Sequence, residues 1–171
     1  MLERHIYLIG MPGSGKSSLG RKVANNLHLP YVDMDRRIQE LLNGTIPEIF
    51  EKYGEAGFRN AETNLLIQLA GTTPSIISTG GGCSMRPLNR DLMRASGAII
   101  LVDRPLRQIL GDIKLERRPL LQEKGLPEVE RLYFERIDTY RALADMTIVN
   151  GGDYYSGVDV LQKMITDHFA L

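Results

Sequence analysis

The stretch GMPGSGKS, residues 10–17, limits the possible folds of this chain more than any other segment. It matches the pattern G-x-x-x-x-G-K-[ST] and stands between a short apolar run, residues 5–9, and an amphipathic stretch that begins at residue 16. In this pattern a buried strand leads into a glycine-rich turn, and a helix follows whose first amides point at a phosphate group. The alternative is an ordinary glycine-rich turn beside an unrelated lysine, but a chance match in a chain of this length has a frequency of about 1%. The stretch therefore predicts an α/β fold and a nucleotide-binding loop.

The residue types in this loop suit the phosphates of a nucleotide. Glycines allow backbone conformations that other residues resist, so several amide groups can converge on one anion. Lys16 adds a positive charge near the β- and γ-phosphates, and the hydroxyl of Ser17 is a ligand for Mg²⁺. We expect the nucleotide to be bound by Gly13, Ser14, Gly15, Lys16, Ser17 and Ser18.

The loop alone does not identify a reaction, because GTPase switches, motor ATPases and small-molecule kinases all contain it. A GTPase would also need an Asn-Lys-x-Asp segment to read guanine, and the sequence contains none. A chain of 171 residues with candidate acceptor-binding residues elsewhere favours a kinase.

Composition narrows the class of protein further. The 171 residues suffice for one domain, residues 1–171, and the 21 Lys and Arg balance the 21 Asp and Glu, which argues against a nucleic-acid partner. Cys83 is the only cysteine, so no internal disulfide can form and a reducing cytoplasm is expected. The apolar runs are too short to cross a membrane, and the N-terminus lacks a signal-peptide pattern. We expect a cytoplasmic monomer that binds neither nucleic acid nor membrane.

Short β-rich runs alternate with longer helical patterns along the chain, which predicts βαβ units and a parallel sheet. Thr45-Ile46-Pro47-Glu48 has the form of a capping box and predicts a helix that starts there. The charged segment 111–125 is predicted to be a mobile surface segment. The predicted strands are 5–9, 30–33, 75–79, 98–102 and 146–149, and the other predicted helices are 16–27, 35–42, 58–69, 87–95, 127–143 and 157–169.

Two carboxylates follow the second predicted strand. Asp33 and Asp35 are two residues apart, so both would face the same way on an extended segment, at the strand end where ligands bind in open α/β sheets. One could hold Mg²⁺ through water, while the other accepts a proton from an attacking hydroxyl. Alternatively, one of them caps the helix that begins near Arg36. Acidic residues would repel a nucleoside monophosphate, so a polyol acceptor fits better.

Three further segments carry candidate site residues. Glu62 either forms a solvated surface pair with Arg59 or orients it towards a substrate anion. The run STGGGCS, residues 78–84, indicates close backbone approach after the third strand, with Cys83 beside it as a reactive thiol or, as we expect, a buried inert one. Arg117 and Arg118 lie where a loop could fold over the nucleotide, or they form an exposed charge cluster.

The order and spacing of six motifs resemble those of the shikimate kinase family over essentially the whole chain. The motifs are GMPGSGKSS, VDMD, GEAGFRNAE, STGGG, RRPLL and FERIDTYR. The resemblance implies a three-layer α/β/α P-loop kinase fold with a five-stranded parallel sheet, a mobile lid at about 111–125 and a substrate-binding helical region at about 33–62. It also implies transfer of the γ-phosphoryl group of ATP to the 3-hydroxyl of shikimate.

The resemblance implies a role for individual residues. Asp35 would bind shikimate hydroxyls and act as the base, while Lys16 and Arg118 would be catalytic cations on the phosphates. Ser17 and Asp33 would hold the Mg²⁺ shell. The substrate would be bound by Asp35, Arg59, Gly81 and Arg136, although Arg136 taken alone would be read as part of a solvated helix face.

One position departs from the family pattern. Gly111 stands where family members often have an arginine that stacks on adenine, and Arg107 or Lys114 could replace it. The segment NGGDYY, residues 150–155, is expected to close the adenine pocket.

The alternative functions for the whole chain are another P-loop kinase, for gluconate or a nucleoside monophosphate, and a non-catalytic nucleotide-binding module.

Overall fold

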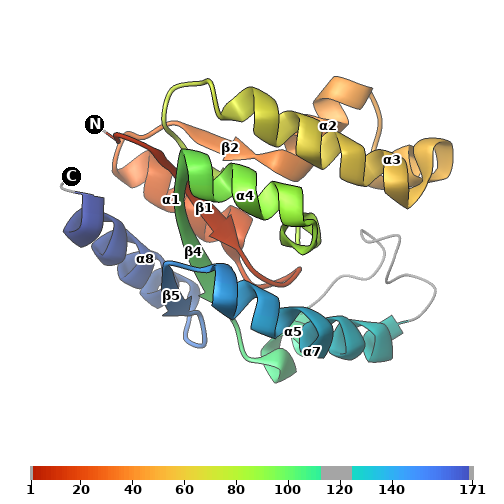
Figure 1. Ribbon diagram of the computed structural model, residues 1–171. Helices are drawn as coiled ribbons and strands as arrows, with labels where there is room; N and C mark the ends of the chain where they lie inside the picture. Colours follow the sequence, from red (N-terminus) through yellow and green to blue (C-terminus); the bar gives the residue numbers. More distant parts are fainter. Residues whose placement is uncertain (1, 113–124, 170–171) are drawn as a thin grey trace.

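Five strands form one parallel sheet in the computed structural model, which describes residues 2–112 and 125–169. The strands follow the order β2-β3-β1-β4-β5, so β1 lies at the centre of the sheet between β3 and β4 (Figure 1). All four described strand pairings are parallel, as predicted. The strands are β1 (His5–Ile9), β2 (Tyr31–Asp33), β3 (Ile76–Ser78), β4 (Gly97–Asp103) and β5 (Met146–Val149).

Helices cover both faces of this sheet and complete the predicted three layers. Helices α1 and α8 pack against one face, and α3, α4 and α7 pack against the other (Figure 1). None of the described helices is both long and apolar enough to span a membrane. The helices are α1 (Lys16–Asn26), α2 (Met34–Leu42), α3 (Ile46–Leu69), α4 (Pro87–Ser96), α5 (Leu106–Asp112), α7 (Gly125–Leu143) and α8 (Tyr154–Phe169), with a 3₁₀ turn η1 (Cys83–Met85).

Strand β1 shows why the apolar runs are continuous. Successive side chains of a strand point to opposite faces, and both faces of this sheet are covered. Tyr7 and Ile9 therefore enter the core under α3, α4 and α7, whereas Ile6 and Leu8 enter the core under α1 and α8. All four side chains are fully buried, which fixes the loop that follows β1 to a rigid support.

Helix α3 joins two segments that were predicted as separate helices. Thr45 and Glu48 form the predicted capping box, with the Thr45 amide donating to Glu48 Oε2 at 2.7 Å. Gly54 interrupts the helix with a φ of 67°, a conformation that glycine adopts at little cost. The second half of α3 therefore takes a new direction, and it carries both Arg59 and Glu62.

Helix α5 is a short element that was not predicted. Its seven residues offer too little periodicity to detect, and Ile109 is its only buried side chain. Gly111 and Asp112 belong to this helix and not to the segment predicted for 111–125. Residues 113–124, with most of the expected lid, Lys114, Arg117 and Arg118, lie outside the described residues.

Candidate functional site

The phosphate loop joins the end of β1 to the start of α1, as predicted. Gly15 is the N-cap of α1 and has a φ of 99°, and a Cβ at this position would lie 2.6 Å from Nδ2 of Asn150. That amide group donates a hydrogen bond to the Ser14 carbonyl oxygen at 2.9 Å. Only glycine fits both the positive φ and this close contact with Asn150. Because Asn150 follows β5, its hydrogen bond holds the phosphate loop against the end of that strand.

A cavity of about 310 Å³ lies over this loop. Lys16 lines it and is almost fully buried, with Nζ donating to the carbonyl oxygens of Gly10 at 2.9 Å and Met11 at 2.8 Å. Asp35 and Gly81 line the same cavity from β2–α2 and from the end of β3. The structure therefore brings predicted donor-side and acceptor-side residues together in one site.

Asp33 and Asp35 do not point the same way, contrary to the prediction. Strand β2 ends at Asp33, and Asp35 lies in the first turn of α2 with the buried Met34 between them. A helical turn rotates successive side chains by about 100°, so the alternation of a strand no longer applies. Asp35 faces the phosphate-loop cavity, and Asp33 lines a separate cavity of about 600 Å³ beside β2.

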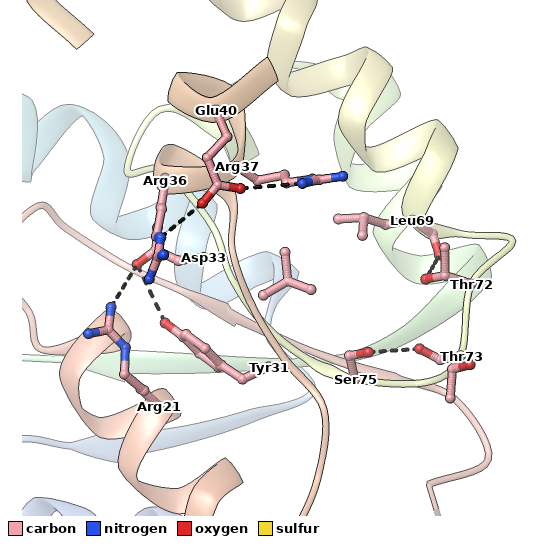
Figure 2. Close-up of a pocket in the computed structure, with 11 residues that line it drawn as sticks. Arg21, Tyr31, Asp33, Arg36, Arg37, Glu40, Leu69, Thr72, Thr73 and Ser75 are labelled. Carbon is pink, nitrogen blue, oxygen red and sulfur yellow. Dashed lines mark hydrogen bonds and ion pairs between the residues drawn. The ribbon is translucent and has the colours of Figure 1, made fainter. Parts of the chain in front are cut away.

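Figure 2 shows the surroundings of Asp33 in this second cavity. Its carboxylate accepts a hydrogen bond from the Arg36 amide at 3.2 Å and so caps α2, which confirms the alternative reading. Arg21 approaches to 3.9 Å, and the Tyr31 hydroxyl lies 3.5 Å away. The same hydroxyl donates to the Ser17 carbonyl oxygen at 3.1 Å, so Asp33 is linked to the phosphate loop through one ring.

The phosphate-loop cavity offers few protein oxygens that could bind a metal ion. Within residues 2–112 and 125–169, no three His, Cys, Asp or Glu side chains cluster to hold an ion by themselves. Mg²⁺, however, usually keeps several waters and binds through few protein oxygens together with substrate phosphates. The Ser17 hydroxyl lines the cavity and lies 3.1 Å from the Ser78 hydroxyl, which fits that kind of site.

Arg59 and Glu62 form a buried pair, so the solvated-surface reading is wrong. Arg59 Nη1 donates to Glu62 Oε2 at 2.8 Å, and the Glu62 side chain is 0% exposed. Glu55, which is exposed to solvent, forms an ion pair with Nη2 of the same guanidinium at 3.2 Å. Burial, with a smaller contribution from the charge of Asp35, raises the pKa of Glu62 to about 7 despite the opposing charge of Arg59.

The glycine run after β3 is the place where the acceptor-side groups meet. A Cβ on Gly80 would lie 2.5 Å from Glu62 Oε1 and 2.9 Å from Asp35 Oδ1, and one on Gly82 would lie 2.5 Å from the Arg59 guanidinium. A Cβ on Gly81 would collide with the Pro12 ring at 2.6 Å. The predicted close approach is therefore confirmed, and its partners are site side chains and the phosphate loop.

Arg136 and Tyr140 bring α7 to the same place. Arg136 is only 8% exposed, so the solvated-face reading is wrong, and its charge acts to lower the pKa of Glu62. Tyr140 lies one turn later and donates its hydroxyl to the Gly81 carbonyl oxygen. Burial raises the pKa of Tyr140 to about 12. Tyr140 was not predicted, although its spacing of four residues from Arg136 placed it on the same helix face.

Arg104 is a further cavity residue that was not predicted. It follows β4, lines the phosphate-loop cavity and donates to the Gly13 carbonyl oxygen at 3.2 Å. Asp112 holds the other end of the guanidinium at 2.5 Å. Gln108, which like Asp112 belongs to α5, donates to the Gly151 carbonyl oxygen at 2.9 Å. Helix α5 thus connects the phosphate loop with the segment 150–155.

Cys83 is buried, as expected. Its side chain is 0% exposed, and Asn89 donates to its carbonyl oxygen at 2.9 Å. Burial raises the pKa of the thiol well above its ordinary value, so the reactive thiolate form is suppressed.

Comparisons with known proteins agree with this geometry. Residues 12–166 match the family model described as Shikimate kinase. A shikimate kinase of Clostridium beijerinckii is 39% identical over 170 residues, which cover 99% of each chain. The structure of a shikimate kinase from Acinetobacter baumannii in complex with shikimate has a TM-score of 0.89 and 32% identity, with 98% of this chain and 93% of that chain covered.

A gluconokinase from Sinorhizobium meliloti is also similar in structure, with a TM-score of 0.60. It is only 14% identical although 99% of this chain and 95% of that chain are covered, so it shows the fold alone. The family model and the relatives of 30% identity or more, by contrast, share the sequence as well as the fold across nearly all of the chain. The chain therefore belongs to the shikimate kinase family.

Proposed function

We propose that this chain transfers the γ-phosphoryl group of ATP to the 3-hydroxyl of shikimate, giving shikimate 3-phosphate and ADP. The observation that carries this proposal is a single cavity lined by Lys16 and Asp35, with the partly buried guanidinium of Arg59 packed against the adjoining glycine run. A site that phosphorylates a hydroxy acid needs a protein carboxylate to accept the proton of the substrate hydroxyl, and arginines to bind the substrate carboxylate. The similarity to shikimate kinases across nearly the whole chain supports shikimate as that acid.

On the acceptor side, each group has a distinct task. Arg59 and Arg136 bind the substrate carboxylate, because a guanidinium can donate to both carboxylate oxygens. The Gly81 amide donates to a substrate hydroxyl, and Tyr140 supports that segment through the Gly81 carbonyl oxygen. Asp35 orients the attacking 3-hydroxyl and accepts its proton as the new O–P bond forms.

On the donor side, the backbone amides of residues 13–18 and the Lys16 ammonium bind the phosphates. Lys16 exchanges its bonds to loop carbonyls for phosphate oxygens, so little charge has to be desolvated anew. Ser17 would hold Mg²⁺ directly and Asp33 through water; the ion when bound offsets charge on the phosphates. We also propose Arg118, outside the described residues, as the lid arginine that reaches the transferring group.

A coupled assay of ADP release tests the reaction. Shikimate, gluconate and nucleoside monophosphates are offered separately with ATP and Mg²⁺, and we expect turnover with shikimate alone. Turnover with gluconate or a nucleotide and none with shikimate would overturn the proposal. Asp35→Asn should abolish most of kcat while leaving ATP affinity nearly unchanged, whereas near-normal turnover would exclude Asp35 as the base.

The carboxylate clamp has a matched control on the same helix. Arg136→Ala should weaken shikimate binding by about 2–5 kcal/mol, because it removes one partner of a desolvated charge pair. Arg131→Ala removes a guanidinium that is 57% exposed on α7 and should leave shikimate affinity unchanged. Equal affinities in both variants would remove Arg136 from the substrate site.

We also infer a single kinase domain over residues 1–171, because all five described strands share one sheet. A cytoplasmic monomer fits the balanced charge and the one free cysteine. Light scattering on the purified chain checks the oligomeric state, and a mass of twice 19.2 kDa would contradict it.

A further inference from the structure

One oxygen of the buried pair has no hydrogen-bond partner among the described residues. Glu62 Oε2 binds Arg59, but Oε1 of the same carboxylate is buried without a donor. Such an atom in a fully buried carboxylate is costly unless the group is protonated or a ligand supplies a donor. Oε1 also faces the glycine run at Gly80, which is the acceptor end of the site.

Charged groups from three helices face Glu62. Arg59 belongs to its own helix α3, Asp35 comes from α2, and Arg136 comes from α7. The thiol of Cys83 in η1 is near enough to be affected by the charge of Glu62 and is itself kept neutral by burial. Asp35 Oδ1 and Glu62 Oε1 both lie within 3 Å of the position that a Gly80 Cβ would occupy, so two carboxylates share this corner.

We propose that Glu62 is a positioning residue that takes up one proton from solution when the substrate carboxylate binds to Arg59 and Arg136. This inference rests on the proposed function, since it requires an anionic acceptor at that clamp. The step converts the Glu62 carboxylate and a solvent proton into a carboxylic acid, and no other bond forms or breaks. The proton sits on Oε1 and faces Asp35, while Oε2 continues to accept from Arg59.

Charge balance gives the physical reason. The substrate carboxylate is a third anion next to Glu62 and Asp35, and it draws donors of Arg59 away from Glu62. Both effects disfavour an ionised Glu62, whose pKa is already raised to about 7 by burial. Protonation of Glu62 removes one negative charge and so ends the repulsion between the Glu62 and Asp35 carboxylates. The protonated Glu62 then offers a hydrogen-bond donor towards the Asp35 carboxylate. Asp35 is thereby left as the single anion beside the attacking hydroxyl.

The sign of the resulting pH dependence follows from linkage. A ligand that increases proton binding binds more tightly where protons are abundant. Shikimate affinity should therefore be constant below about pH 6 and should fall as the pH rises above 7. If the bound complex has a Glu62 pKa one unit higher, the loss of affinity approaches tenfold.

Calorimetry measures the proton directly in the unmodified chain. Shikimate is titrated at pH 7.5 in phosphate and in Tris, whose ionisation enthalpies differ, and the difference in binding heat gives the number of protons taken up. We expect uptake of about half a proton or more at pH 7.5, and none at pH 5.5 in two buffers that titrate at that lower pH and differ in ionisation enthalpy. Binding with the same heat in both buffers would overturn the inference and leave the proposed function intact. Absence of shikimate binding would instead overturn the proposed function, and the inference with it.

Glu62→Gln separates proton uptake from simple support of Arg59. Glutamine imitates the protonated acid, so this variant should take up no proton and should bind shikimate equally well at pH 6 and pH 8.5. At pH 8.5 it should bind several-fold more tightly than the unmodified chain. Affinity weakened by the same factor at both pH values would show that Glu62 acts only as an anion and would overturn the inference. Glu55→Gln, which alters the exposed partner of the same Arg59, should retain proton uptake.

Discussion

The buried carboxylate of Glu62 should make the stability of the fold fall as the pH rises. The pKa of this group is about 7 in the folded chain against an ordinary 4.5, so between these values the folded state binds more protons than the unfolded state. Stability is then fully present below about pH 4.5 and is lost as the pH rises through 7. At 1.36 kcal/mol per pKa unit, the difference corresponds to about 3 kcal/mol of unfolding free energy.

Urea denaturation at pH 5 and pH 8.5 measures this contribution. The unmodified chain should lose about 2.5 kcal/mol more between the two pH values than Glu62→Gln does, because glutamine does not ionise and because the unfolded carboxyl is already mostly ionised at pH 5. Other titrating groups contribute equally to both proteins and cancel in the comparison. Glu55→Gln is the matched control, since Glu55 binds the same guanidinium but is 54% exposed, and it should follow the unmodified chain. Identical pH slopes for the unmodified chain and Glu62→Gln would refute the reasoning.

Three further substitutions test contacts around the cavity. Gly82→Ala places a Cβ 2.5 Å from the flexible end of Arg59, so KM for shikimate should rise about 10-fold or more with little loss of stability. Tyr140→Phe removes the donor to the Gly81 carbonyl oxygen and should lower the unfolding free energy by about 1–2 kcal/mol in urea denaturation. Arg104→Gln removes a cation from the phosphate-loop cavity, so KM for ATP should rise several-fold while KM for shikimate stays constant in the coupled assay.

Each of these substitutions has an outcome that contradicts its premise. An unchanged KM for shikimate in Gly82→Ala would mean that Arg59 does not bind the substrate from its observed place. Tyr140→Phe with unaltered stability would show that the Gly81 carbonyl oxygen finds another donor. A change in KM for shikimate equal to that for ATP in Arg104→Gln would point to a general loss of structure.

The elements that were predicted correctly are those encoded by local patterns. The phosphate loop needs only its own glycines, Lys16 and the flanking strand and helix, all contiguous in sequence. The five strands were found because sheets covered on both faces need continuous apolar runs. The capping box at Thr45 is likewise a matter of four adjacent residues. Local patterns therefore predicted the scaffold and the donor side of the cavity.

Errors arose where a residue's setting depends on distant elements. Asp35 is a different case: it was expected to face the same way as Asp33, because the alternation of a strand was applied across the boundary between the predicted strand 30–33 and the predicted helix 35–42. Arg136 looked like part of a charged helix face until α7 was packed beside Glu62 and the glycine run. Arg104 could not be identified, since its link to Gly13 spans 91 residues.

The single thiol of Cys83 can report how often the folded chain opens locally. Its 3₁₀ turn lies directly after the glycine run and packs against α3, α4 and α7, so an alkylating reagent can reach the sulfur only when these elements separate. Because the chain has no other cysteine, the rate of covalent labelling counts openings of this one corner of the molecule. Cysteines introduced on exposed helices would react without such an opening and could carry fluorophores while Cys83 is still unlabelled.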